Sequence, residues 1–572
     1  MKGLAKRLTL ILLCVLLSTQ SSRALGWDSP KREVRAVWLT TIGGLDWPRQ
    51  KAHSASSIEA QKHELCQILD QLKAANFNTV LLQTRIRSSV IYPSAIEPWD
   101  DCLTGHADRN PGYDPLAFAV EECHKRGIEI HAWIVAFPGN SFKSATALGR
   151  KAIQRRVPRL CLKTNEFWML NPGEPETADY LADICSEIAR NYDVDGINLD
   201  YIRYPESTIR FNDATTYRKY GGGMDKADWR RQNVTHCVET IYKAVKSVRP
   251  WIRVSCSPVG KSQDLTGYSS HGWNSFHTVY QDAQGWLKKG IMDMVVPMMY
   301  FRNGNNFYPF MLDWEEEACG HIFCGGLGAY KLLESEENWS LGELINQLNT
   351  LRQSGAKGQA FFRTQQIIQD TKGLYQFLKN DFYRLPALTP SLCRQDSCTP
   401  ATPISPQIVE MPEGFTLQWA HNDKQGITYN IYRSENFPVN IEKAENLCSI
   451  RQKETAFTIS LRLPSVFLPY YAVTAVDLFG NESPPIAFNR PLSGVQSFCT
   501  GLLTSSDDFK HIFLPQNTAK YVMVTDAVEQ IVRTEAYTRI LDISDLANGL
   551  YSIRTLEEKG RSSCLGKLFI KH

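Results

Sequence analysis

Strand-like and helix-like segments alternate along the chain from about residue 33 to residue 385. Eight apolar runs with the features of buried strands are separated by segments whose apolar residues recur at helical spacing. The predicted strands are Val34–Thr41, Asn78–Thr84, Ile128–Ala136, Val194–Asp200, Ile252–Ser257, Ile291–Tyr300, Ile322–Ala329 and Gly358–Arg363. This pattern predicts an α/β fold, a (β/α)8 TIM barrel with long loops.

A doubly wound open sheet is the alternative fold for such a pattern. It would usually carry a Gly-rich phosphate-binding turn after an early strand, and this sequence has none there. The predicted helices include Ser57–Ala75, Pro115–Arg126, Thr177–Arg190, Trp229–Val248 and Ser340–Ser354. The near-neutral net charge of +3 gives no indication of a nucleic-acid partner.

The first 24 residues predict a secretory signal peptide. Lys2, Lys6 and Arg7 precede the apolar run Leu8–Leu17, and cleavage is expected after Ala24. We therefore expect an exported protein that is periplasmic, on the cell surface or secreted. No transmembrane segment is predicted, because about ten apolar residues are too few to span a bilayer.

At 572 residues the chain is long enough for several domains. The barrel is assigned to residues 30–385, and a Pro-, Ser- and Thr-rich linker to 386–406. Residues 407–495 and 505–572 contain short alternating strands between turns, which predict two small all-β sandwich domains. Trp419 and Tyr432 are the candidate core residues of the first of these domains.

The cysteines lack the paired spacing of zinc ligands, so no metal is predicted, and no cofactor either. Cys393 and Cys398 are close enough in sequence to close a small disulfide loop in an oxidising compartment. Whether they form it is left open.

The segment YDVDGINLDYIRYP, residues 192–205, has the pattern of an active-site strand. Period-2 alternation directs Ile197 and Leu199 to one face and Asn198 and Asp200 to the other. In a parallel barrel, carboxylates at such strand ends usually perform chemistry. In the alternative interpretation Asp200 caps the next segment or pairs with Arg203, and Asp195 is expected to fix the other end of the strand.

Several motifs resemble the glycosyl hydrolase-like family 10. They are VRAVW from Val34, Gln83 with Arg85, Tyr92, Pro98-Trp99, Gly112 to Trp133, DGINLDYIRYP, WRRQNV from Trp229, Ser257-Pro258, Tyr280 to Asp282 and VVPMMYF from Val295. The resemblance implies a (β/α)8 barrel and cleavage of peptidoglycan glycan strands, notably strands without stem peptides. The chain departs from the family pattern at Val135 to Pro138, where the family usually has Asn-Pro and a polar residue.

The same strand is distantly similar to the fourth-strand signature of the family 18 chitinases. Those enzymes place the acid glutamate two residues after the last aspartate, where this chain has Ile202. Ile202 cannot transfer a proton, so a simple family 18 mechanism is excluded and Asp200 is expected to carry more of the work.

Glycoside hydrolysis usually needs two carboxylates beside the scissile bond. Asp200 is the first candidate, and Glu97, beside Trp99 on the loop after the second strand, is the preferred second one. Asp46 and Asp264 are the further candidates. An N-acetyl group of the substrate is the remaining alternative, since substrate-assisted glycosidases exist.

Other residues near the strand ends are predicted to bind the substrate. Arg85 and Arg203 suit a substrate carboxylate such as the lactyl group of muramic acid, with a structural salt bridge as the equal alternative. The apolar faces of aromatic rings match the C–H faces of sugars. The aromatic candidates for such stacking are Trp38, Trp99, Trp133, Tyr201 and Tyr300. The predicted substrate-binding residues are Arg85, Trp99, His131, Trp133, Asn198, Tyr201, Arg203 and Tyr300. His131 is also interpretable as a core histidine.

These patterns predict an exported glycoside hydrolase that acts on the polysaccharide of the cell wall. A catalytically inactive, glycan-binding barrel and a surface adhesin are the alternatives. Residues 407–495 resemble a fibronectin type III module. The Asn-Gly-Leu-Tyr turn at Asn548 and the terminal basic strand resemble C-terminal sorting domains of the type IX secretion pathway, which implies secretion machinery as a partner.

Overall fold

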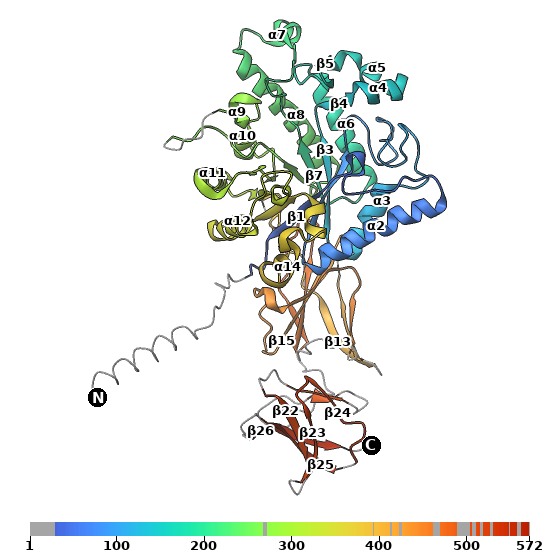
Figure 1. The fold of residues 1–572 in the computed structure, drawn as a ribbon, viewed down its shortest axis with the longest axis vertical. Helices are drawn as coiled ribbons and strands as arrows, with labels where there is room; N and C mark the ends of the chain where they lie inside the picture. Colours follow the sequence, from blue (N-terminus) through green and yellow to red (C-terminus); the bar gives the residue numbers. More distant parts are fainter. Residues whose placement is uncertain are drawn as a thin grey trace, which may run out of the picture.

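The structure is a computed structural model, in which a parallel barrel is followed by small antiparallel sheets (Figure 1). It describes residues 29–266, 272–392, 394–411, 414–422, 426–460, 470–488, 504–505, 511–514, 519–526, 530–547, 549–556 and 562–570. The predicted signal peptide and Cys393 lie outside these residues, and Cys398 is an exposed free thiol. Within the described chain, no helix is long and apolar enough to cross a membrane.

The barrel sheet has the order β10-β9-β8-β7-β3-β2-β1-β12-β11, and every pairing in it is parallel. Its strands are β1 (Val34–Leu39), β2 (Thr79–Arg85), β3 (Glu129–Val135), β7 (Gly196–Asp200), β8 (Arg253–Cys256), β9 (Met294–Val295), β10 (Ile322–Phe323), β11 (Gly325–Gly328) and β12 (Gly358–Phe362). All eight predicted strands are present in these positions.

The two ends of this sheet meet, which closes the barrel. Only Cys324 separates β10 from β11, so the two are successive parts of one strand position. Ile322 in β10 pairs with Met294 in β9, and Gly325 in β11 pairs with Gln359 in β12. The sheet therefore has eight strand positions, and the predicted (β/α)8 barrel is confirmed while the doubly wound sheet is excluded.

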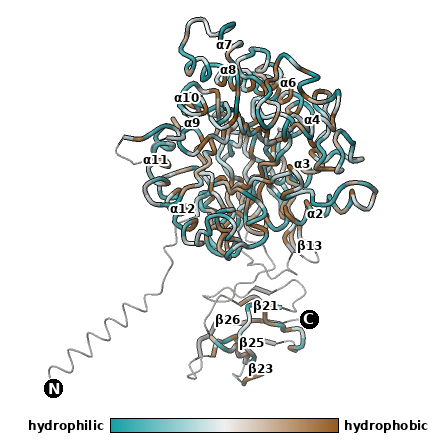
Figure 2. Tube along the Cα trace, turned by 45° about the horizontal axis from the view of Figure 1, so that its top comes forward, coloured by the Kyte–Doolittle hydropathy of each residue, from teal (hydrophilic) through white to brown (hydrophobic). Residues whose placement is uncertain are grey.

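Helices surround the barrel (Figure 1), and the longer ones bury an apolar face against it. They are α2 (Ala55–Ala74), α3 (Pro115–Lys125), α4 (Phe142–Leu148), α5 (Ile153–Arg156), α6 (Glu176–Asn191), α7 (Ala214–Tyr220), α8 (Lys226–Val248), α9 (Ser275–Thr278), α10 (Ala283–Lys288), α11 (Tyr308–Glu316), α12 (Leu341–Ser354), α13 (Thr364–Ile368) and α14 (Leu374–Phe377). In α6, for example, Leu181, Ile184 and Ile188 are buried at helical spacing. Figure 2 shows the same division, with apolar segments in the interior and polar ones outside.

Local sequence signals explain where the helices begin. Asp114 caps α3 by accepting hydrogen bonds from the N–H groups of Leu116 and Ala117, and Pro115 follows at the first helical position. The connection between β3 and α6 also carries a small antiparallel sheet of order β4-β6-β5. Its strands are β4 (Pro138–Ser141), β5 (Cys161–Lys163) and β6 (Phe167–Leu170).

Two antiparallel sheets after the barrel enclose one apolar core. The three-stranded sheet comprises β13 (Ile404–Met411), β14 (Gly414–Ala420) and β17 (Ala456–Ser460), and the four-stranded sheet comprises β16 (Leu447–Gln452), β15 (Thr428–Ser434), β18 (Tyr470–Val476) and β19 (Ile486–Phe488). Trp419 belongs to this core, as predicted, whereas Tyr432 is buried in a separate apolar cluster with Leu388 and Leu447. We call this unit the middle β-domain.

The C-terminal β-domain has the same two-sheet construction around Ile512, Val522, Val524, Leu541 and Ile553. One sheet comprises β20 (Thr504–Ser505), β21 (His511–Phe513) and β24 (Ile540–Asp542), and the other comprises β23 (Ile531–Ala536), β22 (Tyr521–Thr525), β25 (Gly549–Leu556) and β26 (Ser562–Ile570). The predicted two small all-β sandwich domains are therefore present after the barrel.

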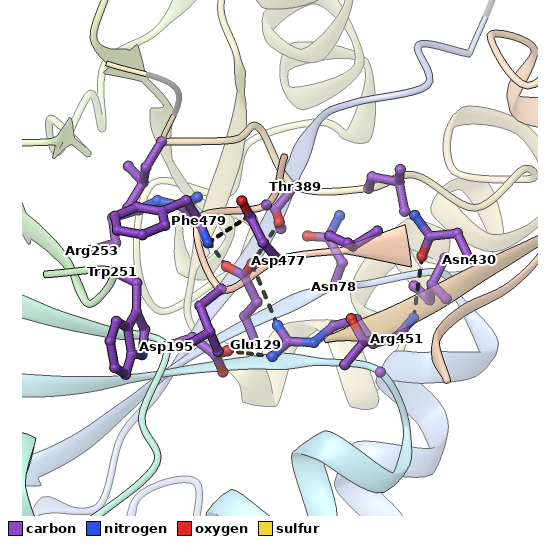
Figure 3. Close-up of a pocket in the computed structure, with 18 of the residues that line it drawn as sticks. Asn78, Glu129, Asp195, Trp251, Arg253, Thr389, Asn430, Arg451, Asp477 and Phe479 are labelled. Carbon is purple, nitrogen blue, oxygen red and sulfur yellow. Dashed lines mark hydrogen bonds and ion pairs between the residues drawn. The ribbon is translucent and has the colours of Figure 1, made fainter. Parts of the chain in front are cut away.

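The middle β-domain docks on the base of the barrel, where the strands begin, and a cavity of about 110 Å³ lies between the two (Figure 3). Arg451 of β16 reaches Asp195 at the start of β7, with 2.5 Å between Nη2 and Oδ1, and lies 3.5 Å from Glu129. Asp195 also accepts hydrogen bonds from the Ile130 N–H and His124. Asp195 thus fixes the base of this strand, which confirms its predicted role.

These contacts keep the base carboxylates ionised. Burial alone would raise the pKa of Glu129, but the guanidinium of Arg253, 2.8 Å away, and that of Arg451 help to lower it to about 2. The pKa of Asp195 is also lowered, since Arg451 and His124 outweigh its burial. A carboxyl whose pKa falls on folding stabilises the fold above its unfolded pKa and loses this contribution as the pH falls through the folded value.

Replacing Arg451 by Ala is expected to lower the free energy of unfolding by about 2 kcal/mol near pH 7, because charged hydrogen bonds across the domain contact are lost. The loss should shrink as the pH falls towards 2, because about half of Glu129 is protonated there and its attraction to Arg451 weakens. Urea denaturation at both pH values measures it. The control is Lys453→Ala, which removes an exposed cation from the same domain. Equal losses of unfolding free energy in the two variants would contradict a stabilising role of Arg451 in the contact between the barrel and the middle β-domain.

Candidate active site

Asp200 is the last residue of β7 and lies at the mouth of the barrel, where the strands end. Its side chain is only 5% exposed. The indole Nε1 of Trp133, on the neighbouring β3, donates to Asp200 Oδ2 at 3.0 Å, and the Tyr201 N–H donates to Oδ1 at 2.7 Å. Both oxygens are therefore held in place from two sides.

Burial dominates the electrostatics of Asp200. It raises the pKa of the carboxyl above its ordinary value, while Arg203 and the two hydrogen-bond donors oppose the rise. The Arg203 Nη1 atom is 3.9 Å from Asp200 Oδ1, too far for a hydrogen bond. A carboxyl in this environment can exchange a proton nearer to neutral pH than an exposed aspartate can, which suits general acid–base chemistry.

Tyr201 and Arg203 form the rim beside this carboxyl. Tyr201 has a φ of +49° and is 44% exposed, so its ring is turned out of the barrel. The Arg203 guanidinium lies 4.3 Å from the centre of that ring, and its buried Nη1 has no hydrogen-bond partner among the described residues. Arg203 therefore keeps a donor available for an anionic or hydroxyl group.

Tyr300 follows β9 by five residues and lies close enough to Asp200 for the charge of that carboxyl to act on it. Its ring stacks on Phe362 at 5.9 Å between centroids, and Tyr330 packs edge-on against it. Burial and the Asp200 charge raise the pKa of the Tyr300 hydroxyl well above its ordinary value. Tyr300 therefore stays protonated and can donate a hydrogen bond at the mouth.

Asn198 and His131 lie below Asp200, inside the barrel. Asn198 donates to Ser255 Oγ at 3.0 Å and accepts from Ser257 Oγ at 2.9 Å. His131 is fully buried, 3.4 Å from Glu129, and its ring packs on Gly196, where a Cβ would be 2.6 Å from it. These contacts favour roles in barrel packing, and they explain the glycine of the DGINLD motif.

Arg85 and Glu97 form a closed pair beneath the loop after β2. Arg85 donates from Nε and Nη2 to the two Glu97 oxygens at 2.7 and 2.8 Å, and Tyr180 donates to the same carboxylate at 2.8 Å. Arg85 also donates to the carbonyl of Ala136 beyond β3. Both side chains are 0% exposed, so the structure favours the structural salt bridge over a contact with substrate.

The other carboxylate candidates have different environments. Asp46 is buried and accepts hydrogen bonds from Arg363 and from the N–H groups of Thr40 and Gln365, which tie the loop after β1 to the end of β12. Burial raises its pKa although Arg363 opposes the rise. Asp264 is partly exposed and pairs with Lys261 at 3.0 Å.

Two further aromatic candidates pack against the barrel. Trp38 is buried against Phe362, at 6.2 Å between centroids, and Trp99 is partly buried against the barrel core. The sequence interpretation did not select Arg87, an exposed side chain two residues after β2 whose charge acts on Tyr201. The position of Arg87 just past the end of a predicted strand is the sequence feature that could have identified it. Among the described residues, no three His, Cys, Asp or Glu side chains gather to hold a metal ion.

Comparison with known proteins places this barrel in a family. A sequence profile described as glycosyl hydrolase-like 10 matches residues 33–314. The glycosyl hydrolase YngK of Bacillus subtilis (strain 168) is 30% identical over 481 residues, 79% of this chain and 92% of YngK. The chain belongs to the glycosyl hydrolase-like 10 family.

Two further similarities accompany this assignment. The glycosyl hydrolase DigH of Escherichia coli (strain K12) is 34% identical over 287 residues, 47% of this chain and 65% of DigH. The glycoside hydrolase domain of PgaB (BpsB) from Bordetella bronchiseptica is similar with a TM-score of 0.44 and 14% identity, over 61% of this chain and 98% of that domain.

The buried pair of Arg85 and Glu97 allows a test of whether Glu97 has a structural or a catalytic role. Glu97→Gln should lower the free energy of unfolding by about 3–5 kcal/mol, because it leaves the buried Arg85 charge without its partner. Chemical denaturation measures this change. The control is Glu176→Gln, which removes an exposed pair with Arg159 and should alter stability little. Unchanged stability together with lost turnover would instead assign Glu97 to the reaction.

Proposed function

We propose that the protein is an exported glycoside hydrolase that cleaves glycosidic bonds in N-acetylated cell-wall glycan, including peptidoglycan strands without stem peptides. One observation carries the proposal. Asp200 is a desolvated carboxyl at the mouth of a barrel that belongs to a glycosyl hydrolase-like family, and two fixed donors orient it. This is the arrangement that general acid–base catalysis requires.

The substrate is proposed to supply the second reacting group. Glu97 is sealed in its pair with Arg85, and Asp46 is tied to Arg363, so neither faces the mouth as a free carboxylate. An N-acetyl group that attacks the anomeric carbon would replace the protein nucleophile, as in known substrate-assisted glycosidases. Asp200 would then transfer the proton or orient this group, and Trp133 would hold Asp200 in place.

Arg203 and Arg87 support a substrate that carries negative charge. The charges of both guanidinium groups oppose the rise in the pKa of Tyr201, beside Asp200, and Nη1 of Arg203 has no hydrogen-bond partner within the described chain. A lactyl carboxylate of muramic acid would match this geometry. The middle and C-terminal β-domains are proposed to be a fibronectin type III-like module and a sorting domain recognised by secretion machinery, with the final location periplasmic, on the cell surface or secreted.

The proposal is tested by mass spectrometry of products from peptide-free glycan strands and from intact peptidoglycan, each incubated with the mature chain, residues 25–572. The wild type should release shortened fragments. Asp200→Asn should reduce the rate at least about 100-fold, because it removes the ionisable group. Asp183→Asn, which changes an exposed carboxylate on α6, is the control and should retain activity.

The other outcomes separate the alternatives. Glycan binding without fragments from any variant would favour an inactive binding barrel. Neither binding nor fragments would favour an adhesin or a different polysaccharide. Equal activity in the wild type and Asp200→Asn would remove Asp200 from the mechanism.

A further inference from the structure

The exposed large apolar side chains of the barrel are gathered on one face. Within the described part of residues 29–392, all of them lie in the segments between a strand end and the following outer helix, or at the first residue of such a helix. They are Leu45 after β1, Tyr201 and Met224 between β7 and α8, Trp273 after β8, and Tyr308 after β9. Single exposed apolar residues are ordinary, but confinement to one face indicates a binding surface.

The three aromatic members follow neighbouring strands. β7, β8 and β9 are adjacent in the sheet, so the loops that carry Tyr201, Trp273 and Tyr308 succeed one another around the mouth. Tyr201 directly follows Asp200 in sequence. The row therefore begins at the proposed reaction centre and leads away from it on one side.

Trp273 and Tyr308 differ from the other aromatic side chains near the mouth. Trp273 is 44% exposed, Tyr308 is 51% exposed, and among the described residues no aromatic ring packs on either. Trp38 and Trp133, by contrast, are buried in the barrel. Trp273 is the one described tryptophan that is exposed, which leaves a large apolar area uncovered.

Polar groups lie next to this tryptophan. Asp264, partly exposed, accepts from Asn274 Nδ2 at 3.4 Å and from the Gly272 N–H at 3.4 Å, and it pairs with Lys261. An exposed apolar ring beside an exposed carboxylate suits a sugar, whose C–H face stacks on the ring while its hydroxyls form hydrogen bonds.

We infer that the glycan extends from the Asp200 site along the loops after β8 and β9, with successive sugars stacked on Trp273 and Tyr308. Asp264, whose side chain is 42% exposed, binds hydroxyl groups of the sugar on Trp273. The inference rests on the proposed function and narrows its substrate to chains several sugars long. It assigns Trp273 and Tyr308 as residues that determine the preference for chain length.

The test uses size-fractionated fragments of peptide-free glycan with the mature chain. The ratio of kcat/KM for long fragments to that for disaccharides is measured in the wild type, Trp273→Ala, Tyr308→Ala and the double variant. Each single Ala variant should lose about tenfold in kcat/KM on long fragments and little on disaccharides. Trp273→Phe and Tyr308→Phe retain a ring and should restore most of the ratio.

The matched control is Tyr521→Ala, which removes a similarly exposed tyrosine from the C-terminal β-domain and should leave the ratio unchanged. Binding of the long fragments to the same variants in an Asp200→Asn background, measured by calorimetry, should follow the same order. If the wild type cleaves glycan but the Ala variants keep the wild-type ratio of kcat/KM for long fragments to that for disaccharides, the inference about Trp273 and Tyr308 is wrong. The proposed function then still stands. If the wild type neither binds nor cleaves any fragment, both are wrong.

Discussion

Closure of the parallel sheet is the constraint on which the rest of the molecule depends. Two close backbone approaches permit it. At Gly358, where β12 begins beside β1, a Cβ would lie 2.1 Å from the Val34 carbonyl oxygen, and at Gly326 it would lie 2.4 Å from the Pro297 carbonyl oxygen. With glycine at both positions the eighth strand position pairs with the first, and the carboxyl ends of all strands converge on one mouth.

The aspartates at the two ends of β7 differ in their electrostatic environment. Asp195 at the base is largely buried and Asp200 at the mouth is buried, yet their pKa values move in opposite directions. Arg451 and His124 contact Asp195 directly and stabilise its ionised form, whereas Arg203 stays 3.9 Å from Asp200 and does not offset the burial. Asp195 therefore stabilises the contact with the middle β-domain, and Asp200 is available for proton transfer.

Much of this could be predicted from the sequence, because strand periodicity and parallel closure are strong local rules. They located the eight strands and placed Asp200 at the mouth. The sequence could not show that Glu97 is paired with Arg85, since their contact depends on how the loop after β2 folds back. For the same reason it counted Trp38, which is buried, among the aromatic candidates for stacking and omitted Trp273, which is exposed. Exposure of a loop aromatic is set by tertiary packing, which sequence periodicity does not record.

The central claim is that the protonation of Asp200, set by burial and by Arg203, governs catalysis. The most direct test is the pH dependence of kcat/KM on a cleaved glycan for the wild type and Arg203→Met. Removing the positive charge disfavours the ionised carboxyl, so the pKa of Asp200 should rise and the pH limb that reports it should move to higher pH. An active Arg203→Met variant whose pH limbs coincide with those of the wild type would contradict the claim.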